Sequence, residues 1–384
     1  MSKLSCLELF AGAGGLAKGL ETAGIEHKAL VEIDHNACLT LAGNYKPELI
    51  YNIDIRSLDF AQFGHIDLIS GGPPCQPFSM AGKHKGHLDR RDMFPYVCKA
   101  IRICTPRAFI FENVKGILRQ SFRRYFDYII LRLTYPEVVI RDSESWQEHL
   151  IRLENIRAFG KYHGVKYHVY FRLLDAANYG IPQRRERVFI VGVREDLERE
   201  WSFPQESHSW ESLLWSQYVS FDYWNSHGVK PSGFEELNPR TKQKIAQLRQ
   251  QPTLFPPPLK PWKTVRDKIG ELPKPDAEGS FDVDHVLREG AKSYPGHTGS
   301  YIDMPSKTLK AGDHGVPGGE NMIRYEDGRI RYYTIFEAKR IQTFPDTYRI
   351  CGSWTESMRQ IGNAVPIELG YCVAKSLVKT IASK

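Results

Sequence analysis

Residues 4–24 read LSCLELFAGAGGLAKGLETAG. The first seven form an apolar run of strand length, a glycine-rich turn follows, and LAKGLETAG has helical spacing. Further strand-like runs are ALVEID, LIYNIDI, IDLISGG and RAFIFENV, and helical patterns occur in NACLTLAGNY and MFPYVCKAIRIC. Strands that alternate with helices predict βαβ units and an α/β fold with a mostly parallel sheet. The later YHVYFRLLDAANYGIPQRRERVFIVGV predicts a hairpin of two more strands.

Residues able to carry chemistry fall at the C-terminal ends of these predicted strands. They are the AGAGG turn, Glu32, Asp54, Cys75 and Glu112. Ligands of open α/β sheets bind at that edge. We therefore expect the functional site there.

Length and composition narrow the class of protein. The 384 residues, 41% of them hydrophobic and 25% charged, suffice for two globular domains. Because no run of about 18 apolar residues occurs, we expect no membrane partner, and the N-terminus lacks the pattern of a signal peptide. The 7 cysteines form no CxxC pair, which argues against a disulfide framework or a metal site and favours a cytoplasmic location. A net charge of +7 suits a polyanionic partner.

Changes in composition and in hydrophobic periodicity along the chain predict its domains. From about residue 196 the periodicity fades and Trp and Pro become frequent, whereas helical spacing returns in TIFEAKRIQTF and IELGYCVAKSLVKTI. We predict a catalytic and cofactor-binding domain at 1–195, completed by 331–384, and a smaller irregular domain at 196–330. The charged segment 119–165 predicts an insertion of helices packed on the outside.

The glycine turn matches a known fingerprint. Gly12, Gly14 and Ala17 fit G-x-G-x-x-G/A, and Glu32 follows about 20 residues later. This favours an adenosyl ligand, either NAD or S-adenosyl-L-methionine; a plain tight turn is the structural alternative. Asp54 either reads an adenine amino group or is a solvated strand-end acid.

Cys75 lies in GGPPCQPFSM, where Pro73, Pro74 and Pro77 fix backbone angles on both sides of it. The stiff loop favours a directed thiol, although a proline-rich turn without function is the alternative. No residues typical of hydride transfer follow.

FAGAGG, GGPPCQPFS, ENV, QRRERVFIVG and QIGNAVP occur in this order. Together they resemble the DNA (cytosine-5)-methyltransferases of bacterial restriction-modification systems, over residues 4–194 and 300–375. The resemblance implies a Rossmann-like, S-adenosyl-L-methionine-dependent methyltransferase domain with a mixed, mostly parallel sheet. It also implies that 196–330 is the target-recognition domain.

The resemblance implies that the Cys75 thiolate adds to carbon 6 of cytosine, which activates carbon 5 toward methylation. Glu112 then meets ring nitrogen 3, which favours a raised pKa from partial burial, and Asn113 holds the Cys75 loop through backbone hydrogen bonds. Arg185 and Arg187 of the Q-x-R-x-R pattern would both point into the site, because alternate residues of an extended segment share a face.

For the cofactor, the resemblance places Phe10 on adenine, Glu32 on the ribose, and Asp54 and Ile55 at the adenine edge. Ile33 stands where the family often has a stacking tryptophan, so it would pack less specifically. The full predicted set is Phe10, Gly12, Gly14, Glu32, Ile33, Asp54, Ile55, Asn363 and Val365.

Double-stranded DNA is the implied substrate, and the target base must leave the stack before a thiol can reach it. A cognate restriction endonuclease is a candidate partner, and we expect a monomer. The predicted DNA contacts are Gln76, Ser79, Lys83, Lys85, Arg90, Arg91 and Gln183.

Three alternatives stay open. A tRNA cytosine-5 methyltransferase has the same architecture, but KGILRQSF after ENV lacks the CFT tripeptide of that branch, and the recognition region is long. A catalytically silent DNA-binding regulator would not need Cys75 and Glu112. A Rossmann oxidoreductase would need hydride-site residues.

Overall fold

The structure, a computed structural model, describes residues 3–74, 92–160, 162–250, 256–275, 282–295, 297–311 and 321–382. The chain divides into two compact units. The first comprises Met1–Leu174, Glu186–Pro204 and Gly370–Lys384, and the second Asp175–Arg185 and Gln205–Leu369. The larger segment of the second unit runs from Gln205 to Leu369. The catalytic domain at 1–195 and 331–384 and the target-recognition domain at 196–330 stay a prediction.

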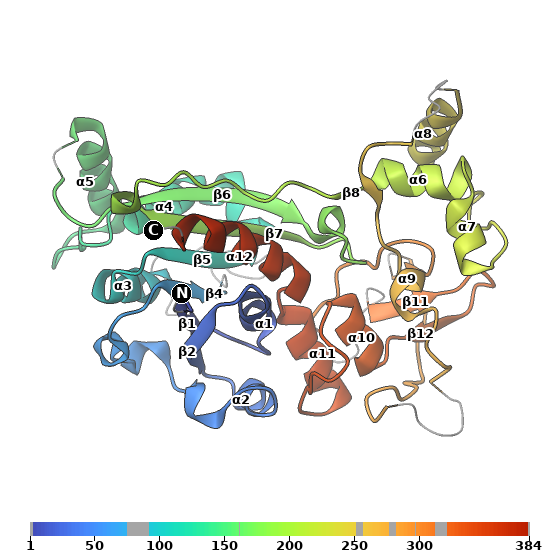
Figure 1. Ribbon diagram of the computed structural model, residues 1–384, viewed down its shortest axis with the longest axis horizontal. Coiled ribbons are helices and arrows are strands. Elements are labelled where there is room, and N and C mark those ends of the chain that lie inside the picture. Colours follow the sequence, from blue (N-terminus) through green and yellow to red (C-terminus); the bar gives the residue numbers. More distant parts are fainter. Residues whose placement is uncertain are drawn as a thin grey trace. The chain divides into compact units, whose positions relative to one another are not determined.

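A seven-stranded sheet in the order β3-β2-β1-β4-β5-β7-β6 forms the centre of the first unit (Figure 1). β1 to β5 pair in parallel, and β7 joins β5 antiparallel, so the sheet is mixed and mostly parallel as predicted. From β1 the chain adds β2 and β3 on one side of the sheet, and then β4 and β5 on the other side. Ligands of such sheets bind at the point between β1 and β4, where this order reverses. The strands are β1 (Ser5–Leu9), β2 (Glu26–Glu32), β3 (Ile50–Asn52), β4 (Leu68–Gly71), β5 (Ala108–Val114), β6 (Tyr167–Asp175) and β7 (Glu186–Arg194).

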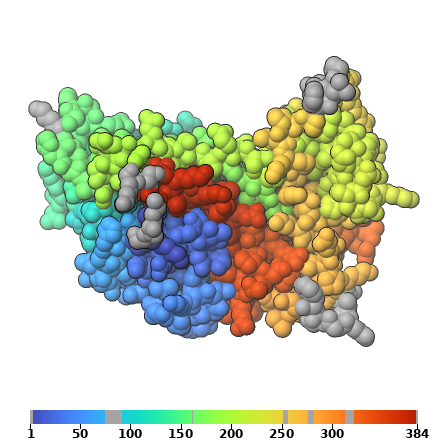
Figure 2. All heavy atoms as spheres, viewed as in Figure 1, coloured from blue at the N-terminus to red at the C-terminus, as the bar shows by residue number. Residues whose placement is uncertain are grey.

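The helices of this unit are α1 (Gly15–Thr22), α2 (His35–Ala42), α3 (Phe94–Cys104), α4 (Arg123–Thr134), α5 (Trp146–Phe159) and most of α12 (Ile367–Ile381). Sheet residues such as Leu7, Ile69 and Phe109 share one apolar core with α3 and α4. Helix α12, red in Figure 2, lies beside the blue N-terminal segment, and in its first turn a Cβ on Gly370 would be 3.2 Å from a side-chain carbon of Leu16.

Gly71 ends β4 where the chain turns toward the Cys75 loop. Its φ is +155°, and a Cβ there would be 2.0 Å from the carbonyl oxygen of Leu9. No side chain fits, so a glycine is required for β4 to lie beside β1 at this point.

The insertion differs from its prediction. α4 does not pack on the outside: its buried face, including Tyr125, Phe126 and Ile129, belongs to the main core. α5 begins with a capping box between Ser145 and Glu148 and exposes more of its surface. The charges of RRYFDYIILRL hid an amphipathic pattern that buries one face.

The second unit has short strands and its own core around Trp224, Leu213 and Ile245. β10-β11-β12 form one sheet and β8-β9 another. Its strands are β8 (His208–Ser209), β9 (Lys260–Pro261), β10 (Ser300–Tyr301), β11 (Met322–Arg324) and β12 (Ile330–Tyr332). Its helices are α6 (Trp210–Tyr218), α7 (Asp222–His227), α8 (Pro239–Gln250), α9 (Val265–Ile269), α10 (Ile335–Ile341) and α11 (Trp354–Asn363). Among the described residues of either unit, no helix combines the length and apolar character needed to cross a membrane.

Candidate active site

A cavity of about 380 Å³ in the first unit collects five of the predicted cofactor residues, at the C-terminal ends of β1 and β2 and after β3. They are Phe10, Glu32, Ile33, Asp54 and Ile55. Five more residues line the cavity that were not predicted from the sequence: Val31, Ile53, Arg56, Pro74 and Met93. Val31 and Ile53 each precede a predicted acid by one residue, but Met93 carried no signal.

Glu32 fixes the glycine turn. One carboxylate oxygen accepts from the amide of Gly12 at 2.8 Å, and the other accepts from the amides of Ile33 and Asp34, each at 2.8 Å. Gly12 has φ +54° and Phe10 has φ 56°, a left-handed backbone that is costly for the phenylalanine. The carboxylate therefore ties a strained turn to the end of β2, and both flank the cavity.

Asp54 pairs with Arg56, a residue that was not among the predicted ones. Its carboxylate accepts from the amide of Arg56 at 2.9 Å and also pairs with the Arg56 guanidinium. These hydrogen bonds lower the pKa of Asp54. Because the pair is largely exposed, it adds little stability, but it keeps Asp54 ionised at the rim of the cavity.

The predicted nucleophile and most of the predicted DNA contacts lie outside the described residues: Cys75, Gln76, Ser79, Lys83, Lys85, Arg90 and Arg91. The residues just before Cys75 are described. Pro74 lines the cavity, and the Asn113 side-chain amide donates to the carbonyl of Pro73 at 3.1 Å. Asn113 thus anchors the start of this loop, as predicted.

Glu112 and Arg187 lie together on neighbouring strands. The Arg187 Nε is 2.8 Å from Oε1 of Glu112, and both side chains are buried. In the β5–β7 register Glu112 faces Phe189 and Val114 faces Arg187, so the pair is diagonal and on one face of the sheet. Burial lowers the pKa of Arg187. A Cβ on Gly72 would be 3.5 Å from the other oxygen of Glu112, so the loop that leads to Cys75 passes this carboxylate.

Arg185 contacts a different set of atoms. It is fully buried in the second unit, and its guanidinium donates to the carbonyls of Leu309 at 3.0 Å, Gly362 at 2.7 Å and Ala364 at 2.9 Å. β7 begins at residue 186, so Arg185 lies just before the strand. The rule that alternate residues of a strand share a face therefore does not apply to Arg185. We interpret Arg185 as the residue that holds the QIGNAVP segment.

Gln183 is also fully buried rather than offered to DNA. Its amide donates to the Gln342 side chain at 3.0 Å, and its oxygen accepts from the amide of Leu309 at 2.9 Å. In the segment that Arg185 holds, Asn363 is exposed and Val365 is buried.

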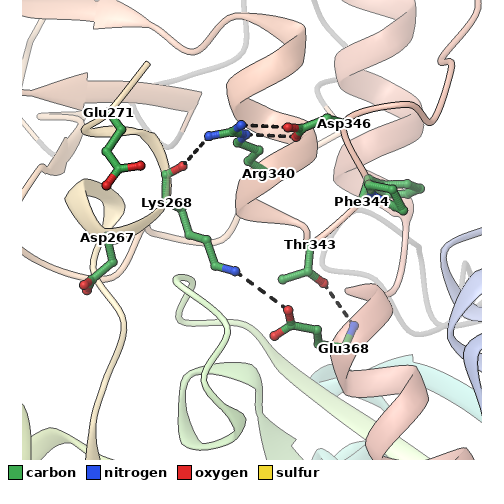
Figure 3. A pocket seen from close by; sticks show the side chains of 9 residues that line it. Asp267, Lys268, Glu271, Arg340, Thr343, Phe344, Asp346 and Glu368 are labelled. Atoms are coloured by element: carbon green, nitrogen blue, oxygen red, sulfur yellow. Dashed lines mark hydrogen bonds and ion pairs between the residues drawn. The ribbon is translucent and has the colours of Figure 1, made fainter.

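The second unit has a cavity of its own, of about 410 Å³ (Figure 3). Arg340 donates to both oxygens of Asp346, at 2.9 and 2.7 Å, and Lys268 lies 3.7 Å from Glu368. Both of its cations are therefore paired with carboxylates, further carboxylates line it at Asp267 and Glu271, and it holds none of the predicted site residues.

Comparison with known proteins adds to this geometry. The family model for C-5 cytosine-specific DNA methylase matches residues 4–135 and 153–379. The Type II methyltransferase M.PspPI of Psychrobacter sp. is 30% identical over 379 residues, which cover 98% of this chain and 79% of that protein. The Type II methyltransferase M.Eco47II of Escherichia coli is 31% identical over 380 residues, covering 97% and 78% respectively.

Solved structures match in fold. The S. pombe Dnmt2 methyltransferase superposes with a TM-score of 0.58 at 19% identity, over 98% of this chain and 99% of that one. The Entamoeba histolytica methyltransferase EhMeth gives 0.56 at 16% identity, over 99% of both chains.

Proposed function

The chain belongs to the C-5 cytosine-specific DNA methylase family, and from that premise we propose that Cys75 and Glu112 carry out the methylation of cytosine, with S-adenosyl-L-methionine bound in the cavity beside Glu32. One observation carries the proposal. Pro74, which directly precedes Cys75, lines the same cavity as Glu32 and Asp54. The methyl donor and the nucleophile would therefore meet at one edge of the sheet.

The cavity suits the cofactor in size and in chemistry. Its volume of about 380 Å³ lies in the range of small-molecule sites. Phe10 and Ile33 offer apolar surface for adenine, whereas Glu32 and Asp54 offer carboxylates for ribose hydroxyls and the adenine amino group. When bound, the cofactor supplies an electrophilic methyl group on a sulfonium.

The protein's own residues would act on the base. The Cys75 thiolate adds to carbon 6, and Glu112 shares its proton with nitrogen 3 as negative charge accumulates there. Carbon 5 would then react as an enamine carbon and accept the methyl group, with the demethylated thioether of the cofactor as the leaving group. Transfer of the carbon 5 proton to solvent water would expel the thiolate, which restores the aromatic ring and the free cysteine.

Arg187 would serve Glu112 and the base together. At 2.8 Å its guanidinium positions the carboxylate, and its remaining donors suit the carbonyl oxygen of a flipped cytosine.

The test is to express the protein and a Cys75→Ser variant in a bacterial host without cytosine-5 methylation and to sequence bisulfite-treated DNA. We expect protected cytosines within one short sequence motif for the wild type and none for the variant. The purified variant should still bind S-adenosyl-L-methionine. Methylation by the variant would rule out the covalent step, and protection in tRNA alone would reassign the substrate.

A further inference from the structure

A third cavity in the first unit, of about 290 Å³, lies between α3 and α4, the helices drawn in Figure 1. Lys99 and Arg102 reach it from α3 and Arg132 from α4, and Val138 and Val139 form part of an apolar wall. No carboxylate lines it. Three positive charges therefore converge on one small concave surface, outside the site described above.

Other cations nearby are paired. Arg152 lies 2.7 Å from Glu144, and Arg124 lies 3.8 Å from Glu154. Lys99, Arg102 and Arg132 make no ion pair or hydrogen bond with any residue in the described ranges. Lys99 lies 5.9 Å from the ring centre of Phe60, and Arg132 lies 5.5 Å from that of Tyr128. Arg132 also feels the more distant charge of Asp92, a carboxylate that does not line the cavity.

Arg132 is the cation of this cavity for which the lack of an anionic partner matters most. Its side chain is partly buried, whereas Lys99 and Arg102 are exposed. A guanidinium withdrawn from water is unfavourable unless an anion or several acceptors replace the lost hydration. The cation–π contact with Tyr128 and the more distant charge of Asp92 supply part of that compensation, and neither supplies a hydrogen-bond acceptor to the guanidinium.

We propose that this cavity, defined by Lys99, Arg102 and Arg132, is a binding site for a phosphoryl anion. Two guanidinium forks match the oxygens of a tetrahedral oxyanion, and a third cation suits its second charge. The apolar wall at Val138 and Val139 limits competing water. The phosphoryl group belongs either to a free phosphate ester or to the DNA backbone beside the target, and both sources present the same chemistry.

The first experiment uses inorganic phosphate as the probe, at constant ionic strength. The Nε–Hε resonance of Arg132 should shift in the full-length protein in a saturable way. Arg132→Gln should weaken phosphate binding about tenfold, as measured by calorimetry. Arg102→Gln should weaken it about threefold, as measured from the Arg132 resonance. Arg102 is exposed, so its variant stays informative if Arg132→Gln folds poorly. Arg157→Gln, an exposed arginine on α5, is the matched control and should change nothing.

The second experiment separates the sources by measuring DNA affinity as a function of salt. If a backbone phosphate occupies the cavity, Arg132→Gln and Arg102→Gln should each reduce the slope of log K against log salt by about 1, and Arg157→Gln should not. A phosphate effect with an unchanged slope identifies a free phosphate ester as the ligand. No saturable phosphate shift and no change in slope would overturn the proposal.

Discussion

Glu8 lies within β1 and is almost fully buried, with an oxygen that accepts from the Ser70 hydroxyl at 2.9 Å. Burial raises its pKa from 4.5 to about 8, against the opposing hydrogen bond from Ser70. The folded state therefore prefers the neutral carboxyl, and the stability this gives is lost as pH rises from about 4.5 to about 8. Glu8→Gln should remove this pH-dependent loss of stability. Between pH 4.5 and pH 8 we therefore expect the free energy of unfolding of the variant, relative to that of the wild type, to increase by on the order of 4 kcal/mol.

Denaturant unfolding of both proteins at several pH values measures this difference. Titrations of other groups cancel because the two proteins share them. A stability difference that stays constant with pH would show that Glu8 is ionised in the folded protein.

Arg187 gives a prediction about catalysis. Arg187→Gln should lower the methyl-transfer rate constant by roughly 10²–10³, as removal of one buried, positioned donor does in other enzymes. Cofactor affinity should be unchanged, because Arg187 does not line the cavity. Single-turnover kinetics and calorimetry separate the two effects, and Arg187→Lys retains the charge if the glutamine variant folds poorly.

The control is Lys115, which directly follows β5. In an exposed position it pairs at 2.8 Å with Glu186, the residue before Arg187 on β7. Because exposed ion pairs contribute little, Lys115→Gln should change the rate less than about twofold. An equal loss in both variants would mean that Arg187 acts only through the stability of the strands.

Single residues also show which parts of the candidate site could be predicted from the sequence. Glu32 and Asp54 were predicted because acids at strand ends follow from periodicity, and both line the cavity. Arg56 was missed because its pairing with Asp54 depends on the turn that begins at Ile55. Arg185 was misplaced because β7 begins one residue after it. Periodicity within a strand says nothing about a side chain just outside that strand.

At the scale of elements, the joint between α4 and α5 depends on a buried histidine. His149 accepts from the Tyr128 hydroxyl at 2.9 Å through Nδ1 and donates to the carbonyl of Val138 at 2.9 Å through Nε2, the tautomer that satisfies both contacts. Burial lowers its pKa from 6.5 to about 4. The neutral ring is the folded form, so stability is retained above pH 6.5 and is lost as pH falls toward 4.

His149→Gln should lack this acid-dependent loss, which we expect to reach on the order of 2–3 kcal/mol near pH 4 in the wild type. The variant starts from a lower stability at neutral pH, because glutamine does not reproduce both hydrogen bonds. The stabilities of the two proteins should therefore approach each other as the pH falls, and thermal unfolding of both as a function of pH measures this. Parallel curves would place the acid-sensitive group elsewhere.

The same elements explain which parts of the fold could be predicted. β1, β4, β5 and β7 were predicted from apolar runs that the sheet then buries along most of their length, so pattern and burial agree. The edge strands β3 and β6 were also predicted, although many of their residues stay exposed or half-buried. α4 was expected outside because its charges were more conspicuous than its apolar stripe of Tyr125, Phe126 and Ile129. Which surface covers such a stripe is decided by tertiary packing, and a local pattern cannot supply that information.

For the whole molecule, the order of strands matters more than any one motif. The reversal between β1 and β4 brings the glycine turn and the loop before Cys75 to one edge, although they are about 60 residues apart in the chain. The sequence predicted the parallel strands but not their spatial order. The cavity therefore could be expected at the strand ends, while its wall at Pro74 and Met93 required the fold.

Hydrogen exchange over the full chain tests this site as a unit. S-adenosyl-L-methionine at about 100 times its dissociation constant stabilises a protein that binds it by about 2.7 kcal/mol. Amides of the glycine turn and of the segments around Glu32 and Asp54 should therefore exchange more slowly, because they flank the cavity and help to fix its carboxylates. NAD at the same concentration should leave them unchanged, since its larger body does not match a cavity of about 380 Å³. Glu32→Gln should weaken the protection without abolishing it, because an amide oxygen can still accept from Gly12. Protection by NAD, or none by S-adenosyl-L-methionine in the wild type, would mean that this cavity is not the methyl-donor site.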